Sequence, residues 1–168
     1  MIKILKKSTI VKPKLSILVQ DWGVRESFHF FDYLKKQNIS KNEFEIVFVD
    51  FYNELNPKIK NYFDFIDTAI LLNFSKDFHY HKHLMFNAGL LFSNGKIFCI
   101  CDSDAIVDEN FCNYIINFHH NNPRSYLHID QFRNENRDYY PFNFPNYDEL
   151  IKNSYNYNEL IECAEGKL

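Results

Sequence analysis

The sequence has little of the residues that define several special protein classes. Its 168 residues include only four glycines and five prolines, too few for a collagen-like or low-complexity chain. Aromatic residues make up 18% of the chain, which excludes intrinsic disorder because they supply ample apolar area for a core. The 19 basic and 22 acidic residues give no excess of positive charge of the kind that binds nucleic acid, so no such partner is expected. Length and composition indicate one globular domain over residues 1–168.

Cysteines and long apolar segments are also scarce. The four cysteines form no C-x-x-C pair, so neither a disulfide framework nor a cysteine zinc site is expected. Cys99 and Cys101 alternate within an apolar run, which predicts that both thiols lie on one face of a buried strand of a cytoplasmic protein. No apolar stretch reaches the ~20 residues of a membrane helix.

The first 13 residues form a basic lead-in that has no continuous apolar run. Lysines stand at positions 3, 6, 7 and 12 of this segment, and Lys14 follows it directly. This pattern does not fit a secretion signal. A solvated segment is the favoured interpretation, and peripheral contact with the inner face of a membrane is the alternative.

Short apolar runs alternate with segments of helical periodicity along the chain. Buried strands are predicted over residues 15–19, 44–49, 69–74 and 96–101, with a fifth over 125–132. Helices are predicted over residues 25–37, 81–92 and 108–122, with Asp108 as a cap, and over 147–163. Strands that alternate with helices predict an α/β, Rossmann-like fold, with a mainly parallel sheet covered by helices on both faces.

Acidic and aromatic side chains follow three of these strands. Asp21 and Trp22 come after the first strand, Asp50 ends the second, and Asp102 and Asp104 follow the fourth. In parallel α/β sheets, ligands bind beyond the carboxyl ends of the strands, at the point where the strand order reverses. These residues therefore mark the candidate site.

Asp102 and Asp104 carry the strongest chemical signal. Two carboxylates one residue apart after a buried strand are costly unless a cation neutralises them. Mn²⁺ or Mg²⁺ suits this pair, because such ions bind one or two carboxylates and complete their shell with substrate phosphates. The plain alternative is a loop whose acids turn the chain or cap the next helix. The position directly after an apolar strand favours the metal and diphosphate site.

The order and spacing of these segments resemble family 2 glycosyltransferases. Residues 15–50 are similar to the opening of that family and residues 82–104 to its middle, so that the resemblance covers about residues 14–122. It implies a GT-A fold and a nucleotide-diphosphate-sugar donor, with a UDP-sugar favoured. It also implies Mn²⁺ or Mg²⁺ at the D-x-D pair, and transfer to a glycan or lipid-linked acceptor.

The resemblance implies a role for each candidate residue. Trp22 takes the place of the loop aromatic that lies near the donor base, and Asp50 that of the acid that contacts this base. Asp104 is the more direct of the two implied metal ligands. The implied nucleotide-sugar-binding residues are Asp21, Trp22, Asp50, Lys82, Asn87 and Asp102, and the implied metal ligands are Asp102 and Asp104.

The chain departs from the family pattern at two points. The two acids and Gly-Ser that commonly end the second strand of the family are absent around Asp50. The acidic base of an inverting transfer is unassigned, because no acid after Asp104 lies in a matching motif. The acids available are Asp130, Asp138, Asp148 and Glu149. Residues 123–168 are expected to form part of an acceptor side, which another polypeptide could complete.

Two other functions use the same residues. A non-catalytic nucleotide-sugar-binding module, or a truncated remnant of an enzyme, would keep the donor site without transfer. A haloacid-dehalogenase-like phosphohydrolase would use Asp102 as the nucleophile and Asp104 as the acid/base. That second family expects Thr where Ile106 stands.

The remaining motifs are weak. His79, His81 and His83 would align as metal ligands on a strand, but no acidic or cysteine ligand accompanies them, so a solvated or phosphate-facing role is favoured. A Walker A loop, a G-x-G-x-x-G loop and a G-x-S-x-G elbow are all missing, which leaves NTPase, dinucleotide and serine hydrolase functions without support.

Overall fold

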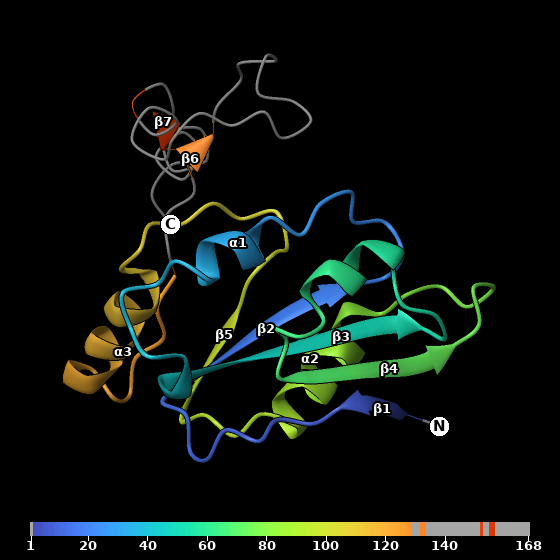
Figure 1. Cartoon of the computed structure of the whole chain (residues 1–168), viewed down its shortest axis with the longest axis horizontal. Helices are drawn as coiled ribbons and strands as arrows, with labels where there is room; N and C mark the ends of the chain where they lie inside the picture. The colour runs from blue at the N-terminus through green and yellow to red at the C-terminus, as the bar shows by residue number, and fades with distance from the viewer. Residues whose placement is uncertain (1, 129–131, 134–151, 153–154, 157–168) are drawn as a thin grey trace, which may run out of the picture. The chain divides into compact units, whose positions relative to one another are not determined.

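The structure is a computed structural model that describes residues 2–128, 132–133, 152 and 155–156 (Figure 1). The chain divides into two compact units, residues 1–123 and residues 124–168. The first unit holds a five-stranded sheet with its helices, and the second holds a two-stranded antiparallel sheet. None of the helices in these described ranges is long and apolar enough to cross a membrane.

The elements of the first unit follow the predicted alternation of strands and helices. Its strands are β1 (Lys3–Lys6), β2 (Leu15–Asp21), β3 (Phe44–Tyr52), β4 (Thr68–Phe74) and β5 (Ile97–Ile100). Its α-helices are α1 (Phe30–Leu34), α2 (Lys82–Leu91) and α3 (Phe111–Asn121), and its 3₁₀ helices are η1 (Lys41–Glu43) and η2 (Pro57–Tyr62). The second unit contains β6 (Phe132–Arg133) and β7 (Tyr155–Asn156).

The order of the strands in the sheet creates a reversal point. The order is β1-β4-β3-β2-β5, in which β2 to β5 are parallel and β1 runs antiparallel to β4. The chain passes outward from β2 through β3 to β4 and then returns to the other side of β2 as β5. The strand order therefore reverses between β2 and β5, where α/β sheets bind their ligands. The predicted α/β class with a mainly parallel sheet is confirmed.

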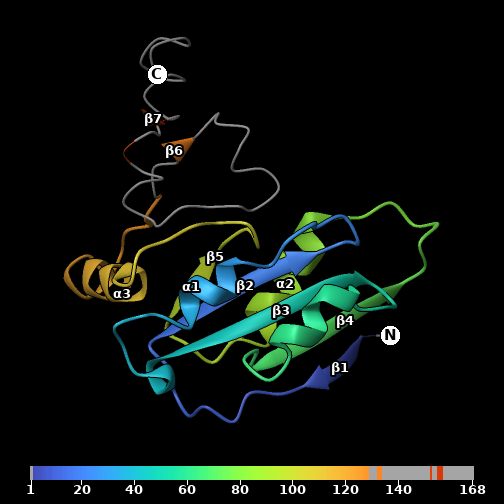
Figure 2. The same cartoon turned by 45° about the horizontal axis from the view of Figure 1, so that its top comes forward.

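Side chains on both faces of the sheet are buried, as the continuous apolar runs of β2 and β3 predicted. Helix α2 covers one face, whereas α1 and η2 cover the other (Figures 1 and 2). The α2 side has a core of Leu18, Val47, Val49, Phe51, Ile70, Leu72, Met85 and Ala88. On the α1 side, the ring of Phe28 meets the ring of Phe48 edge to face at a centroid distance of 6.0 Å.

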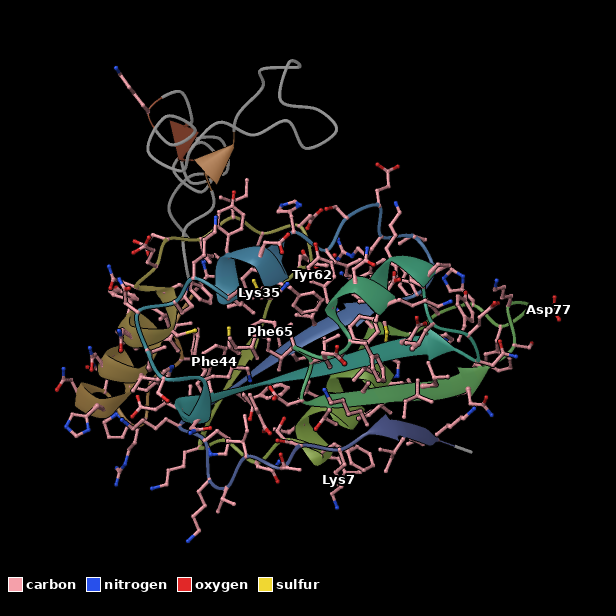
Figure 3. All side chains as sticks on the ribbon, in the orientation of Figure 1. Lys7, Lys35, Phe44, Tyr62, Phe65 and Asp77 are labelled. Atoms are coloured by element: carbon pink, nitrogen blue, oxygen red, sulfur yellow. The ribbon has the colours of Figure 1, made fainter. Side chains whose placement is uncertain are left out.

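Lysines and aromatic rings close the α1 side of the sheet at its surface. The Lys35 ammonium lies 4.8 Å from the centre of the Tyr62 ring and 5.7 Å from that of Phe65 (Figure 3). Lys41 lies 4.8 Å from the centre of the Phe44 ring and pairs with Asp67. These contacts attach α1 and η1 to the segment that leads into β4.

A buried polar network fixes the amino end of β5 against β2. The fully buried Glu45 side chain accepts hydrogen bonds from the Ser16 hydroxyl at 2.6 Å and from the Asn94 side-chain amide at 3.0 Å. The Ser16 hydroxyl oxygen in turn accepts from the Gly95 backbone N–H at 2.8 Å. A Cβ at Gly95 would lie 2.7 Å from the Ser16 backbone nitrogen, so only glycine permits this close approach.

The predicted helix over residues 25–37 is wrong in its first half, because α1 spans only Phe30–Leu34. The residues before α1 form a loop around the Asp21 carboxylate instead. Helix α3 also begins later than expected, at Phe111, so the predicted cap at Asp108 is wrong and Asn110 holds the N-cap position. The Asp108 carboxylate accepts a bond from the Asn110 N–H at 2.9 Å, in the turn that precedes the helix.

The two ends of the chain differ from the sequence-based expectations. Residues 3–6 of the predicted solvated lead-in form the edge strand β1, and the Lys6 ammonium donates to the Phe63 carbonyl at 3.0 Å. Residues 125–128 are not a strand, so the strand predicted over 125–132 is wrong there. Most of the helix predicted over 147–163 lies outside the described residues, and Tyr155–Asn156 within it is a strand.

Candidate functional site

The candidate site lies at the carboxyl ends of β2, β3 and β5. Asp21 is the last residue of β2 and pairs in register with Asp50 of β3. Strand β5 lies beside β2 and runs on into the loop that carries Asp102 and Asp104. The parallel sheet thus brings together acids that are up to 83 residues apart in the sequence, at the point where the strand order reverses.

Asp21 organises the loop that follows β2. Its Oδ1 atom accepts hydrogen bonds from four backbone N–H groups, those of residues 22 to 25, at 2.8 to 3.3 Å. Its Oδ2 atom accepts from the side-chain amide of Asn56 at 2.9 Å. The side chain is fully buried, so this carboxylate shapes the loop from within. Direct contact of Asp21 with a donor stays a prediction.

The loop of Asp102 and Asp104 is attached to residues 25–30 through its middle residue. Ser103 is fully buried; its hydroxyl donates to the Ser27 carbonyl at 2.9 Å and its carbonyl accepts from the Phe30 N–H at 3.2 Å. The His29 Nε2 atom lies 2.8 Å from the Asp104 carbonyl oxygen. Burial lowers the pKa of His29, which favours the neutral ring as the donor of this bond.

With Ser103 held inside, the two acids of the D-x-D pair point outward. Their side chains are 54% exposed for Asp102 and 53% for Asp104. Arg25 bridges them: its Nη2 atom pairs with Oδ1 of Asp102, and its Nη1 atom lies 3.5 Å from Oδ1 of Asp104. A guanidinium is suited to such a bridge because its donors form a planar fork.

Trp22 lies at the centre of a stack of aromatic and cationic side chains. Its ring stacks on Tyr80 at a centroid distance of 4.5 Å and an angle of 12°. The guanidinium of Arg25 lies 5.0 Å and the ammonium of Lys82 lies 5.1 Å from the centre of the Trp22 ring. The stack joins the loop after β2 to the start of α2, and it presents aromatic and positively charged groups beside the acids.

Asp50 is a buried acid with one carboxylate oxygen to spare. Its Oδ1 atom accepts from the Tyr52 N–H at 3.1 Å, while its Oδ2 atom is buried without a hydrogen-bond partner in the described part of the chain. Burial raises the pKa of Asp50 to about 7, and the nearby Asp21 charge acts in the same direction.

Unsatisfied buried polar atoms gather at this end of the sheet. Within the described residues, the buried side-chain atoms that lack a partner are Oε1 of Gln20, Nε of Arg25 and Oδ2 of Asp50. Gln20 and Asp50 lie near the carboxyl ends of β2 and β3, and Arg25 lies in the loop after β2. Because buried polar groups are normally hydrogen-bonded, these two acceptors and one donor are exceptions, with hydrogen-bonding capacity unused at this end of the sheet.

The structure thus brings most of the predicted site residues together. Asp21, Trp22 and Asp50 lie with the D-x-D pair at one end of the sheet. Lys82 joins them because its ammonium lies over the Trp22 ring. Asn87 is exposed on α2. The acids considered as the base (Asp130, Asp138, Asp148 and Glu149) lie outside the described residues.

Arg25, Tyr80 and Asn56 contact the candidate residues as well, and the sequence analysis did not single them out. Arg25 falls in a segment whose periodicity predicts a helix, and only the order of the strands reveals that it reaches the D-x-D pair. Tyr80 stands between two of the histidines singled out as possible metal ligands. Those histidines, at positions 79, 81 and 83, have exposed side chains.

The D-x-D pair fits a divalent metal that arrives with a phosphate ligand. In the described ranges, no group of three or more His, Cys, Asp or Glu residues could hold a metal by itself. A typical Mg²⁺ or Mn²⁺ site has, however, only one or two carboxylates as protein ligands, and phosphate oxygens and water complete the shell. The two half-exposed carboxylates match that ligand set. Asp102 and Asp104 would hold such an ion.

Comparisons with known proteins agree with this fold. Two crystal structures of S. aureus TarS 1-349 share the fold at 19% sequence identity. The first has a TM-score of 0.54, and the second, in complex with UDP-GlcNAc, has a TM-score of 0.52. Both matches cover 64% of this chain, but only 32% and 31% of the TarS chain, so this chain spans about a third of those structures.

A comparison with curated protein sequences gives no match. Among protein-family models, Glycosyl transferase family 2 matches residues 29–168, which is most of the chain. This match and the GT-A-like sheet favour a glycosyltransferase over the phosphohydrolase alternative. The chain therefore belongs to glycosyl transferase family 2.

Proposed function

We propose that this site binds a nucleotide-diphosphate sugar, with a UDP-sugar favoured, and transfers the sugar to a glycan or lipid-linked acceptor. The observation that carries the proposal is the D-x-D loop at the reversal point: a buried Ser103 between two outward carboxylates, Asp102 and Asp104. Family membership supports transfer as the reaction class. The complex of TarS with UDP-GlcNAc supports the donor class.

Each part of the site has a task in this proposal. Asp102 and Asp104 would hold Mn²⁺ or Mg²⁺, which when bound neutralises charge on the departing diphosphate. Trp22 and Tyr80 offer stacking area for the donor base. The free Oδ2 atom of Asp50 suits a base that carries an N–H donor, as uracil does.

The transfer itself needs a base that takes the proton from the acceptor hydroxyl as this oxygen attacks the anomeric carbon. This base is unassigned, and we propose that the transfer inverts the anomeric configuration. The described residues supply the donor side: they bind and orient the diphosphate and keep the carboxylates in position.

Calorimetric titration with UDP and other nucleoside diphosphates, with and without Mn²⁺, tests the donor site. Metal-dependent binding of UDP is expected, and an absence of metal-dependent binding to every nucleotide would refute the proposal.

A non-catalytic binding module is the second candidate, because the described residues hold donor-side groups but no assigned base. Release of UDP from a UDP-sugar in the presence of Mn²⁺ would identify an enzyme. Tight UDP-sugar binding without any release would identify the module.

A further inference from the structure

The guanidinium of Arg25 occupies the space between the two carboxylates that would hold the metal. Its Nη2 atom pairs with Oδ1 of Asp102, and its Nη1 atom lies 3.5 Å from Oδ1 of Asp104. The same two carboxylate oxygens cannot bind a divalent ion while this fork stands between them. Arg25 and the metal therefore compete for one position.

Arg25 is built into the site and differs from a mobile surface arginine. Its side chain is only 14% exposed, whereas the carboxylates that it bridges are about half exposed. Its backbone N–H donates to the buried Asp21 carboxylate at 3.2 Å, and its guanidinium lies 5.0 Å from the centre of the Trp22 ring. Its Nε atom is buried without a partner in the described part of the chain, so the guanidinium has a donor left for another acceptor.

The charges at the site indicate when Arg25 can leave the two carboxylates. Two carboxylates and one guanidinium leave a single negative charge. A divalent ion that arrives alone reverses this charge and must displace a bonded guanidinium. A divalent ion that arrives with the two phosphates of a sugar donor restores the single negative charge, and the phosphates also offer acceptors to the displaced guanidinium.

We propose that Arg25 is a resident counter-cation that blocks the metal position at Asp102 and Asp104 until a metal and a diphosphate arrive together. It then turns from the carboxylates to the diphosphate, so that metal and donor binding are coupled. The diphosphate half of this inference rests on the proposed function. The competition between Arg25 and the metal does not.

Binding of Mn²⁺ alone, measured from the EPR signal of the free ion, tests the competition. Arg25→Gln should bind Mn²⁺ more tightly than the wild-type chain by about ten-fold or more, the change expected when one charge-assisted contact no longer competes. Arg25→Lys should lie between the two, because an ammonium lacks the fork that spans both carboxylates. If the Gln variant does not fold, as judged by circular dichroism, the Lys variant alone must bind Mn²⁺ more tightly than wild type.

Two control variants locate the effect. Lys60→Gln removes a positive charge from an exposed position of η2 and should leave the Mn²⁺ affinity near that of wild type. Asp104→Asn, added to Arg25→Gln, should abolish the gain. The proposal is overturned if Arg25→Gln binds Mn²⁺ no more tightly than wild type, if Lys60→Gln gains as much, or if the double variant keeps the gain.

Addition of UDP separates this inference from the proposed function. UDP should raise the Mn²⁺ affinity of wild type more than that of Arg25→Gln, because the arginine no longer has to be displaced in the variant. An equal rise in both chains would overturn the coupling. If UDP binds neither chain, the proposed function fails and the coupling with it, but the measurement with Mn²⁺ alone still decides the competition.

Discussion

Replacement of Asp50 by Asn should make the protein more stable at neutral pH and flatten part of its pH dependence. Burial raises the pKa of Asp50 from 3.8 to about 7. The Asp50 carboxyl therefore binds its proton more tightly in the folded protein than in the unfolded chain. This tighter binding stabilises the folded protein most below about pH 4, and the stabilisation is lost as the pH rises to about 7. A shift of about three pKa units corresponds to roughly 4 kcal/mol.

The asparagine side chain has nearly the same shape as the aspartate that it replaces but no proton to lose. The free energy of unfolding of Asp50→Asn minus that of wild type should therefore rise with pH. Somewhat more than half of the total rise of roughly 4 kcal/mol should occur between about pH 5 and about pH 8. Urea unfolding followed by circular dichroism, at a series of pH values on both proteins, measures this difference. Titrating groups that do not interact with Asp50 cancel because they are present in both chains.

The same substitution at Asp77 provides the matched control. Asp77 is exposed in the loop between β4 and α2 (Figure 3), so Asp77→Asn makes an identical chemical change at a solvated carboxyl. The stability difference between Asp77→Asn and wild type should not follow the curve for Asp50. If the Asp50→Asn difference stays constant within about 1 kcal/mol over this pH range, the reasoning about the buried carboxyl is refuted.

Three further substitutions test other parts of the account. Asp104→Asn should leave UDP binding insensitive to Mn²⁺ in calorimetry, and a retained metal response would place the ion elsewhere. Trp22→Ala should weaken UDP binding about ten-fold or more through lost stacking, while an unchanged affinity would remove Trp22 from the donor site. Gly95→Ala should lower the free energy of unfolding by about 1–3 kcal/mol, because the new methyl group meets the Ser16 backbone at 2.7 Å, and a wild-type urea midpoint would contradict this contact.

The sheet and the position of the site could be predicted from the sequence. The runs that form β2, β3 and β4 are apolar enough for strands buried on both faces, and helical segments separate the strands. The burial predicted for the strand over 96–101 is wrong, because β5 is an edge strand whose side chains are half-buried or exposed. Acids at the ends of such strands fall at one edge of a parallel sheet. This is why the sequence alone could single out Asp21, Asp50 and the D-x-D pair.

The loop after β2 could not be predicted in the same way. The spacing of Phe28, Phe31 and Leu34 is helical, yet residues 22–25 direct their backbone N–H groups to the Asp21 carboxylate and leave helix α1 short. One buried acceptor thus outweighs the local periodicity. The role of Arg25 depends on that loop and on the pairing of β5 with β2, so neither spacing nor composition could reveal it.

Trp22 offers the most direct test of the central claim, because it is the only tryptophan in the chain and lies in the candidate site. Its fluorescence should change in a saturable manner when UDP is added with Mn²⁺. The change should be much smaller without the metal, and equally small in Asp104→Asn whether or not Mn²⁺ is present. If calorimetry detects UDP binding while the Trp22 fluorescence stays constant, the nucleotide binds elsewhere and the account of this site is contradicted.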